Sequence, residues 1–284
     1  MKPLPLSVQA IYLFRTRAWL YLGVTLLMDF LKFSLFLLAI RIFWLWLATH
    51  GTSLTVTGSW ESMSWISKIE SIISFLVRQW DAMTLGAQAL AEAAFFFFAF
   101  TFEFMNVRGI CRIASDQLTD QTVRFREASR DMFAFFPGAL VYALVMEIAL
   151  ACALLLPIAL GLRGVAAQVP ALLAFALFSL TVPAAAAERL GVFAALRRGL
   201  ALVGMVFGRA FALFVLDLLA FVFVSKTMDA AFYAASARSG SIDLVVAGVT
   251  FCCLLLVKIF VYIYLTLLFY RARDRVASLA TAAA

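Results

Sequence analysis

Long apolar runs separated by short polar stretches dominate the chain, and their lengths decide its predicted secondary structure. A helix needs about 20 mostly apolar residues to cross the hydrocarbon core of a bilayer. The polar stretches are too short to bury a core of their own, because domains usually need upwards of about 50 residues. The pattern predicts an all-α, polytopic transmembrane bundle of about six helices, with spans at residues 19–47, 85–104, 133–160, 165–187, 203–224 and 244–270.

Composition agrees with a lipid environment. The chain is 65% hydrophobic with a mean hydropathy of +1.02, against about 45–50% apolar residues in an average soluble domain. The formal charge of +7 does not indicate nucleic acid, because the basic residues are scattered at helix ends rather than gathered in one stripe. We expect a single integral membrane domain over residues 1–284, in contact with the lipid bilayer and without a nucleic-acid partner.

The distribution of basic residues predicts the orientation. The two tails and the connections after the second and fourth spans hold 14 of the 23 basic residues, whereas the other connections hold five. Basic residues collect on the cytoplasmic side of a membrane, so both termini are expected in the cytoplasm. Arginine outnumbers lysine 18 to 5, which favours a GC-rich bacterial genome. The predicted location is therefore a bacterial cell inner membrane, crossed several times.

Tryptophan placement supports this topology, since indole rings favour the boundary between lipid and water. Between residues 65 and 80, apolar side chains recur at helical spacing opposite serine and arginine. This segment is too polar to span, so we predict an amphipathic helix at residues 64–82 in the outer interface. The predicted interfacial anchors are Trp19, Trp44, Trp46, Trp60, Trp65 and Trp80.

A short basic stretch of helical character precedes each odd-numbered span, at residues 7–18, 119–132 and 188–199. Each stretch is expected to form a short amphipathic helix at the interface that turns into the following span. The chain then consists of three helical hairpins, each entered from the cytoplasm, as in parallel repeats. The alternative is that any cytoplasmic helix entrance tends to be basic, with no repeat.

One of these stretches carries a family resemblance. Pro183, Glu188 and Gly191 precede the run Ala-Leu-Arg-Arg-Gly at residues 195–199 and then a hydrophobic helix. This pattern resembles the membrane domain found beside some bacterial glycerophosphodiester phosphodiesterases, and its stand-alone relatives of unknown function. Gly199 replaces the usual serine, and residues 270–273, Tyr-Arg-Ala-Arg, look like the closing residues of that domain. The resemblance implies an architecture for the second half of the chain and no activity.

Catalytic motifs are absent from the sequence. It contains no G-x-S-x-G, no H-E-x-x-H and no glycine-rich phosphate loop, and His50 is its single histidine. We therefore predict no metal site, no cofactor and no enzymatic activity. Asp116 and Asp120 offer one alternative, a divalent cation held for a phosphate-bearing lipid, although the interpretation we favour is a solvated face and helix cap. The phenylalanines at residues 95–104 are typical of a lipid-facing helix, with contact to a quinone or pigment as the alternative.

Charged residues inside the spans are the most informative positions. A charge at the centre of a membrane helix costs about 2.5–3.5 kcal/mol on insertion scales, so such groups usually face protein or water. They form either neutralised pairs between helices or a polar pathway. We expect Lys258 to pair with Asp217, with Asp29 and Glu147 as alternative partners, and Lys32 is able to meet Asp29 three residues away on its own helix. We exclude Arg41 and Glu103, which are close enough to span ends to reach water. The candidates are Asp29, Lys32, Glu92, Glu147, Asp217 and Lys258.

Two functions fit this pattern. The first is a non-enzymatic scaffold, assembly factor or accessory subunit of a membrane complex, bound to a membrane-protein partner or to further copies of itself. The second is a transporter or permease subunit that uses the intramembrane carboxylates. A water-accessible cavity reaching Asp29, Glu147 or Asp217 would favour the transporter, and a sealed bundle would favour the scaffold.

Overall fold

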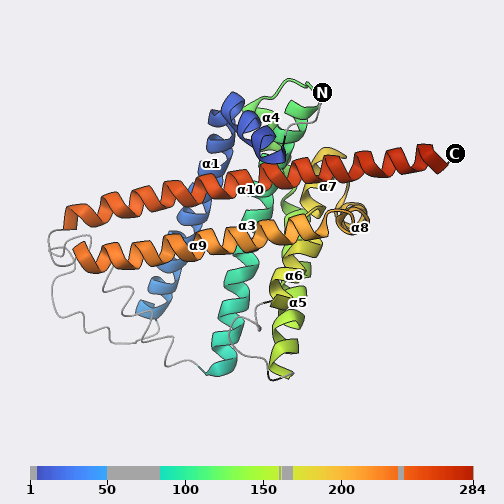
Figure 1. Ribbon diagram of the computed structural model, residues 1–284. Coiled ribbons are helices and arrows are strands. Elements are labelled where there is room, and N and C mark those ends of the chain that lie inside the picture. Colours follow the sequence, from blue (N-terminus) through green and yellow to red (C-terminus); the bar gives the residue numbers. More distant parts are fainter. Residues whose placement is uncertain (1–4, 50–83, 160, 162–168, 236–239, 284) are drawn as a thin grey trace. The chain divides into compact units, whose positions relative to one another are not determined.

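The computed structural model describes residues 5–49, 84–159, 161, 169–235 and 240–283, and these residues contain helices and turns but no strand (Figure 1). The helices are α1 (Leu6–Thr49), α3 (Leu85–Leu118), α4 (Phe125–Ala134), α5 (Phe136–Ala159), α6 (Val169–Phe178), α7 (Thr181–Ala187), α8 (Val192–Val203), α9 (Phe207–Ala235) and α10 (Gly240–Ala283). The predicted helix at residues 64–82 lies outside the described residues and stays a prediction.

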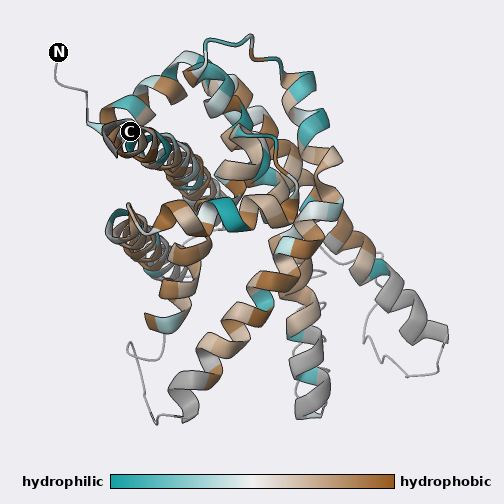
Figure 2. Ribbon diagram, turned by 90° about the vertical axis from the view of Figure 1, so that its right-hand side faces the viewer, coloured by the Kyte–Doolittle hydropathy of each residue, from teal (hydrophilic) through white to brown (hydrophobic). Residues whose placement is uncertain are grey.

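Six helical segments of the described chain are long and apolar enough to cross a membrane, which confirms the predicted fold class (Figure 2). Their limits differ from the predicted spans mainly where a helix continues past its apolar run. The first begins at Leu6 and the second continues to Leu118, because the basic flanking residues remain helical. The segments are Leu6–Ala39, Glu92–Leu118, Phe136–Ala153, Val169–Ala187, Phe207–Val224 and Gly248–Thr281.

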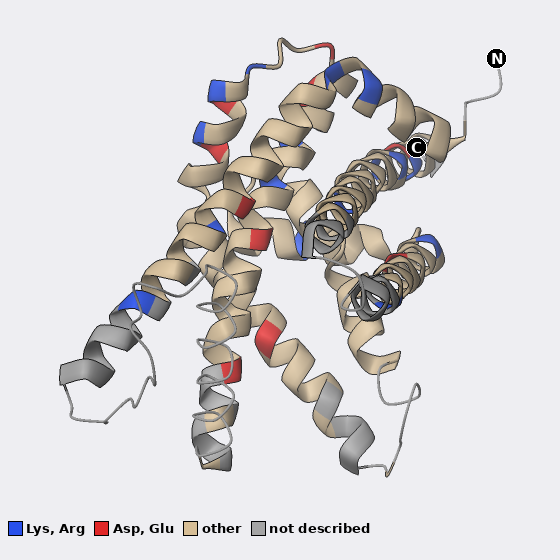
Figure 3. Ribbon diagram, turned by 90° about the vertical axis from the view of Figure 1, so that its left-hand side faces the viewer, with Lys and Arg blue, Asp and Glu red and all other residues tan. Residues whose placement is uncertain are grey.

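A short helix leads into a long one at three places in the described chain. Helix α4 breaks at Phe135 before α5, and α8 ends in a turn at residues 204–206 before α9. In α1 the non-helical backbone of Arg17 (φ −140°, ψ 34°) separates a short first segment from the long remainder. Helix α4 is amphipathic and carries charges of both signs along its length (Figure 3). The first break lies within the first basic stretch, and the other two follow the second and third stretches by a few residues.

The chain divides into two compact units, which are described separately. The smaller unit comprises residues 29–99, the later part of α1 and the beginning of α3. The larger unit comprises residues 1–28 and 100–284. In the larger unit α9 and α10 lie side by side as an antiparallel hairpin, α6 packs against α9, and α7 packs against α8 (Figure 1).

The core of the larger unit is built on close helix contacts. Tyr21 of α1, Ile110 of α3 and Phe269 of α10 are each fully buried. Gly199 permits the contact between α8 and the start of α7, since a Cβ atom there would lie 2.8 Å from both the Cα and the amide nitrogen of Thr181. Backbone cannot yield to such a clash, which gives a steric reason for glycine at position 199.

Candidate binding pocket

A pocket of about 530 Å³ lies among the apolar helices of the larger unit. Its volume is within the usual range of about 300–1,000 Å³ for small-molecule sites. Helices α3, α6, α9 and α10 supply most of the wall, and α5 and α7 complete it. The lining residues are Phe100, Glu103, Phe104, Val107, Met146, Leu172, Phe175, Phe178, Ser179, Val182, Phe214, Asp217, Leu218, Leu254, Val257, Lys258, Val261, Tyr262 and Leu265.

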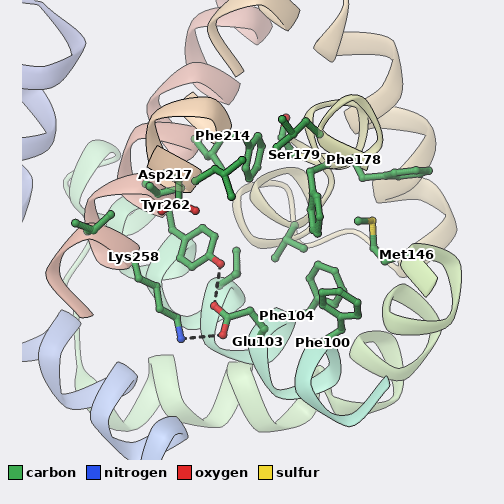
Figure 4. A pocket seen from close by; sticks show the side chains of 18 of the residues that line it. Phe100, Glu103, Phe104, Met146, Phe178, Ser179, Phe214, Asp217, Lys258 and Tyr262 are labelled. Atoms are coloured by element: carbon green, nitrogen blue, oxygen red, sulfur yellow. Dashed lines mark hydrogen bonds and ion pairs between the residues drawn. The ribbon is translucent and has the colours of Figure 1, made fainter. Parts of the chain in front are cut away.

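The pocket has a polar side and an apolar side (Figure 4). The charged side chains and the Tyr262 hydroxyl group gather on one side, where α3, α9 and α10 face one another, whereas Ser179 lies beside Phe178; the residues of the polar side are Glu103, Asp217, Lys258 and Tyr262. Opposite them lie aromatic and thioether side chains, namely Phe100, Phe104, Met146 and Phe178. A wall of this kind is suited to a molecule with one polar end and one apolar end.

Glu103 of α3 organises the polar side. Its Oε2 lies 2.8 Å from Nζ of Lys258 on α10, and its Oε1 accepts a 2.8 Å hydrogen bond from the hydroxyl group of Tyr262, also on α10. Both carboxylate oxygens are therefore engaged. The Glu103 and Lys258 side chains are 24% and 21% exposed, so the pair borders the pocket rather than lying sealed beneath it.

Asp217 of α9 faces the same pocket without a comparable partner. Its carboxylate makes no ion pair or hydrogen bond to another residue that the structure describes. Asp217 also borders a second cavity, of about 470 Å³, which lies between the start of α1 and the α9–α10 hairpin. Val257 and Val261 line both cavities as well. Asp217 is thus adjacent to open space on two sides of the hairpin.

A chain of aromatic rings extends from α3 to α9. Ring centroids are 6.2 Å apart for Phe100 and Phe104, 6.2 Å for Phe100 and Phe175, and 6.0 Å for Phe175 and Phe214. Phe214 is about one helical turn from Asp217 on α9, and both side chains line the pocket. The ring chain therefore ends next to the carboxylate.

The expected pairing of Lys258 with Asp217 is wrong, because Lys258 pairs with Glu103. The prediction assumed that consecutive helices provide the partner, and it treated Glu103 as a residue at the end of a span. In the structure α3 continues to Leu118, which places Glu103 well inside the helix and opposite α10. The apolar run at residues 93–102, which precedes Glu103, was the available signal in the sequence.

The remaining charged candidates lie outside the pocket. Asp29 and Lys32 form an ion pair on α1, with 3.2 Å between Oδ1 and Nζ. Glu92 is exposed on α3. All three residues belong to the smaller unit. Glu147 on α5 is half-buried, and its Oε1 has no hydrogen-bond partner among the described residues. The structure therefore brings only Asp217 and Lys258 of the six candidates into one site.

The tryptophan candidates are described only in part. The Trp19 side chain is 61% exposed on α1, as expected of a residue that meets lipid headgroups. Trp44 and Trp46 belong to α1, but their side chains are not described, and Trp60, Trp65 and Trp80 lie outside the described residues. Their role as interfacial anchors stays a prediction.

A second group of charges, which the sequence did not single out, surrounds the end of α3. Arg108 forms a two-pronged ion pair with Asp131 of α4, at 2.8 and 3.2 Å, and its guanidinium group lies 4.8 Å from the centre of the Phe135 ring. Arg198 of α8 holds Glu188 in the same two-pronged manner. These pairs tie the short helices to their neighbours.

The alternative cation site at Asp116 and Asp120 receives no geometric support. Asp116 is held by Arg112 at 2.9 Å, and Asp120 lies in the turn after α3 with a left-handed backbone (φ 52°). Within the described residues, no group of three or more histidine, cysteine, aspartate or glutamate side chains is arranged to hold a metal ion.

Comparison with known proteins adds no assignment to this geometry. No family model matches the chain, and neither the curated proteins nor the solved structures gave a significant match.

Proposed function

We propose that this membrane protein is a transporter or permease subunit that admits an amphiphilic solute into the pocket between α3, α6, α9 and α10. The observation that carries the proposal is the cavity of about 530 Å³ reaching Asp217. Helix interiors are normally close-packed, and charged side chains at membrane depth usually border protein or a water-filled path. A cavity of this size beside a charged side chain is therefore suited to a solute.

The competing proposal is a scaffold, assembly factor or accessory subunit, alone or as a homo-oligomer. Its support is the exposed apolar surface of α9, which includes Leu216, Leu219 and Phe223 at 63%, 58% and 73% exposure. Lipid chains cover such a surface as well as a partner helix does, since both are apolar. The cavity therefore favours the transporter, and no chemical step is part of the proposal.

We further propose that the protein belongs to a bacterial inner membrane with both termini in the cytoplasm, as the basic residues suggest. Single cysteines at the exposed positions Thr227 and Ser278 test the orientation in a background without native cysteines. A membrane-impermeant maleimide should label Thr227→Cys in intact cells and Ser278→Cys only after lysis. The reverse pattern would overturn the topology.

The transporter and the scaffold differ in whether water reaches the pocket. Ser179 lines the pocket, whereas the next residue, Leu180, is fully buried and does not. In a cysteine-free background, we expect the neutral, water-soluble reagent hydroxyethyl methanethiosulfonate to modify Ser179→Cys in membrane vesicles and to leave Leu180→Cys unmodified. Equal protection of both cysteines would favour the scaffold.

A pocket-filling pair of variants controls this test. Leu172 lines the pocket, while its neighbour Leu173 is 37% exposed on the outer face of α6. Adding Leu172→Trp to Ser179→Cys should slow the modification, because the indole occupies the cavity, and adding Leu173→Trp should not. Equal modification rates in the two would contradict the assignment of the pocket as the route to Ser179.

A further inference from the structure

The charges that line the pocket do not balance. Glu103 and Lys258 neutralise each other at 2.8 Å, and the hydroxyl group of Tyr262 engages the second oxygen of Glu103. Asp217 is left as a carboxylate without an ion pair to the described residues. The formal charge of the lining is therefore −1, and it is located at Asp217.

An ionised carboxylate in apolar surroundings is costly unless a cation compensates it. The chain does not bring Lys258 to Asp217, because Glu103 already holds the ammonium group. An anionic ligand would be repelled by Asp217, and a neutral one would leave the carboxylate uncompensated. A cationic ligand would supply the missing positive charge.

The surroundings of Asp217 suit an organic cation. Phe214 and Asp217 are three residues apart on α9, so their side chains share one face of the helix, and both line the pocket. Aromatic faces attract ammonium groups. Beyond Phe214, the rings of Phe175 and Phe100 continue the apolar surface away from the carboxylate. A molecule with a cationic head at Asp217 can therefore place its apolar chain along these rings.

We propose that the pocket selects a monovalent amphiphilic cation, with its ammonium head at Asp217 and its apolar chain against Phe214, Phe175 and Phe100. This inference rests on the proposed function, to which it adds the substrate class. The second cavity gives the same carboxylate an approach from the α1 side of the hairpin. Asp217 is thus the group that a cation meets from either cavity.

Protection of Ser179→Cys from hydroxyethyl methanethiosulfonate measures this selectivity in nonionic maltoside micelles. The three probes share one chain and differ in the head: decyltrimethylammonium, decanol and decyl sulfate. We expect half-protection by the cation at about one tenth of the decanol concentration, a ratio equivalent to about 1.4 kcal/mol, and the weakest protection by the sulfate. Equal potency of the three probes would overturn the proposal.

Three further variants assign the preference to Asp217. Asp217→Asn should remove the tenfold preference for the cation and leave protection by decanol unchanged, whereas Asp217→Glu, which restores the charge, should keep the preference. Glu147→Gln is the matched control, because Glu147 is also a half-buried acid in a span but does not line the pocket. A loss of preference in Glu147→Gln equal to that in Asp217→Asn would overturn the assignment to this site.

The outcomes separate this inference from the proposed function. If Ser179→Cys reacts and decanol protects it but the cation has no advantage, the pocket remains a solute site and the cation selectivity is wrong. If Ser179→Cys never reacts, both proposals fail together.

Discussion

The charged end of the larger unit and its pocket both contain acidic and basic side chains, but they differ in how completely these charges are paired. The charged end is defined here as residues 108–116, 124–134 and 188–203, which include the later part of α3, α4 and α8. There, each of four carboxylates lies within 4 Å of an arginine, in the pairs Arg108–Asp131, Arg112–Asp116, Arg124–Glu127 and Arg198–Glu188. In the pocket, one carboxylate is paired and Asp217 is not.

Packing is also closer at the charged end than around the pocket. At the charged end, α8 approaches α7 so closely that Gly199 has no room for a Cβ atom. Around Asp217 the helices leave a cavity on each side of the hairpin. Compensated charge and close packing favour stability at the charged end, whereas the proposed function assigns the uncompensated charge beside open space to ligand binding.

The largest effect is expected for Asp131→Asn. The Arg108 side chain is only 8% exposed, so removing its partner leaves a buried guanidinium charge and should lower the free energy of unfolding by about 3 kcal/mol. Replacing both residues, as Arg108→Met with Asp131→Leu, should recover most of that loss. Thermal unfolding in detergent measures both.

Glu127→Gln controls this experiment on the same helix. Glu127 pairs with Arg124 at 3.7 Å, but the two side chains are 61% and 72% exposed, so its loss should cost less than about 0.5 kcal/mol. If Glu127→Gln and Asp131→Asn lowered the free energy of unfolding by similar amounts, the negative charge of α4 would matter and the buried pair would have no special role.

Gly199→Ala tests the close packing at the same end. A methyl group 2.8 Å from the backbone of Thr181 has to push α8 from α7, and overpacking of this kind costs about 1–3 kcal/mol. Gly208→Ala should be neutral or stabilising, because nothing lies within 4 Å of the added Cβ and alanine favours a helix. Equal midpoints of thermal unfolding for the two variants would contradict the contact.

A double-mutant cycle tests the charge assignment in the pocket. Glu103→Gln and Lys258→Met should show a coupling free energy of about 1–2 kcal/mol, as contacting residues do. The cycle of Asp217→Asn with Lys258→Met should give a clearly smaller coupling, because Lys258 is held by Glu103. A larger coupling free energy for Asp217 with Lys258 than for Glu103 with Lys258 would instead support the pairing that the sequence predicted.

The most direct contrast with Asp131 is expected at Asp217. Asp217→Asn removes a carboxylate without an ion pair, so it should raise the free energy of unfolding by about 0.5–1 kcal/mol in the empty protein. Unfolding of the wild type and the variant in maltoside, without added amphiphile, measures the difference. A loss of stability in the variant would mean that Asp217 contributes to the fold as the paired acids do.

The sequence by itself determined the properties that depend on local composition. The length of each apolar run indicated six membrane-crossing helices, because hydrophobic length is measured along one segment. The basic stretches marked the places where α1, α4 and α8 break before a long helix. The pair Asp29 and Lys32 was also predictable, since residues three apart share one helix face.

Only the tertiary structure decided which distant residues meet. Glu103 and Tyr262 are 159 positions apart in the chain and share a hydrogen bond, and no local pattern specifies that contact. The error over Lys258 has the same origin, because chain neighbours were taken as spatial partners while α3 supplied the carboxylate. Helix packing depends on the shapes of whole faces, so the unpaired Asp217 and its cavities appear only after the helices have packed.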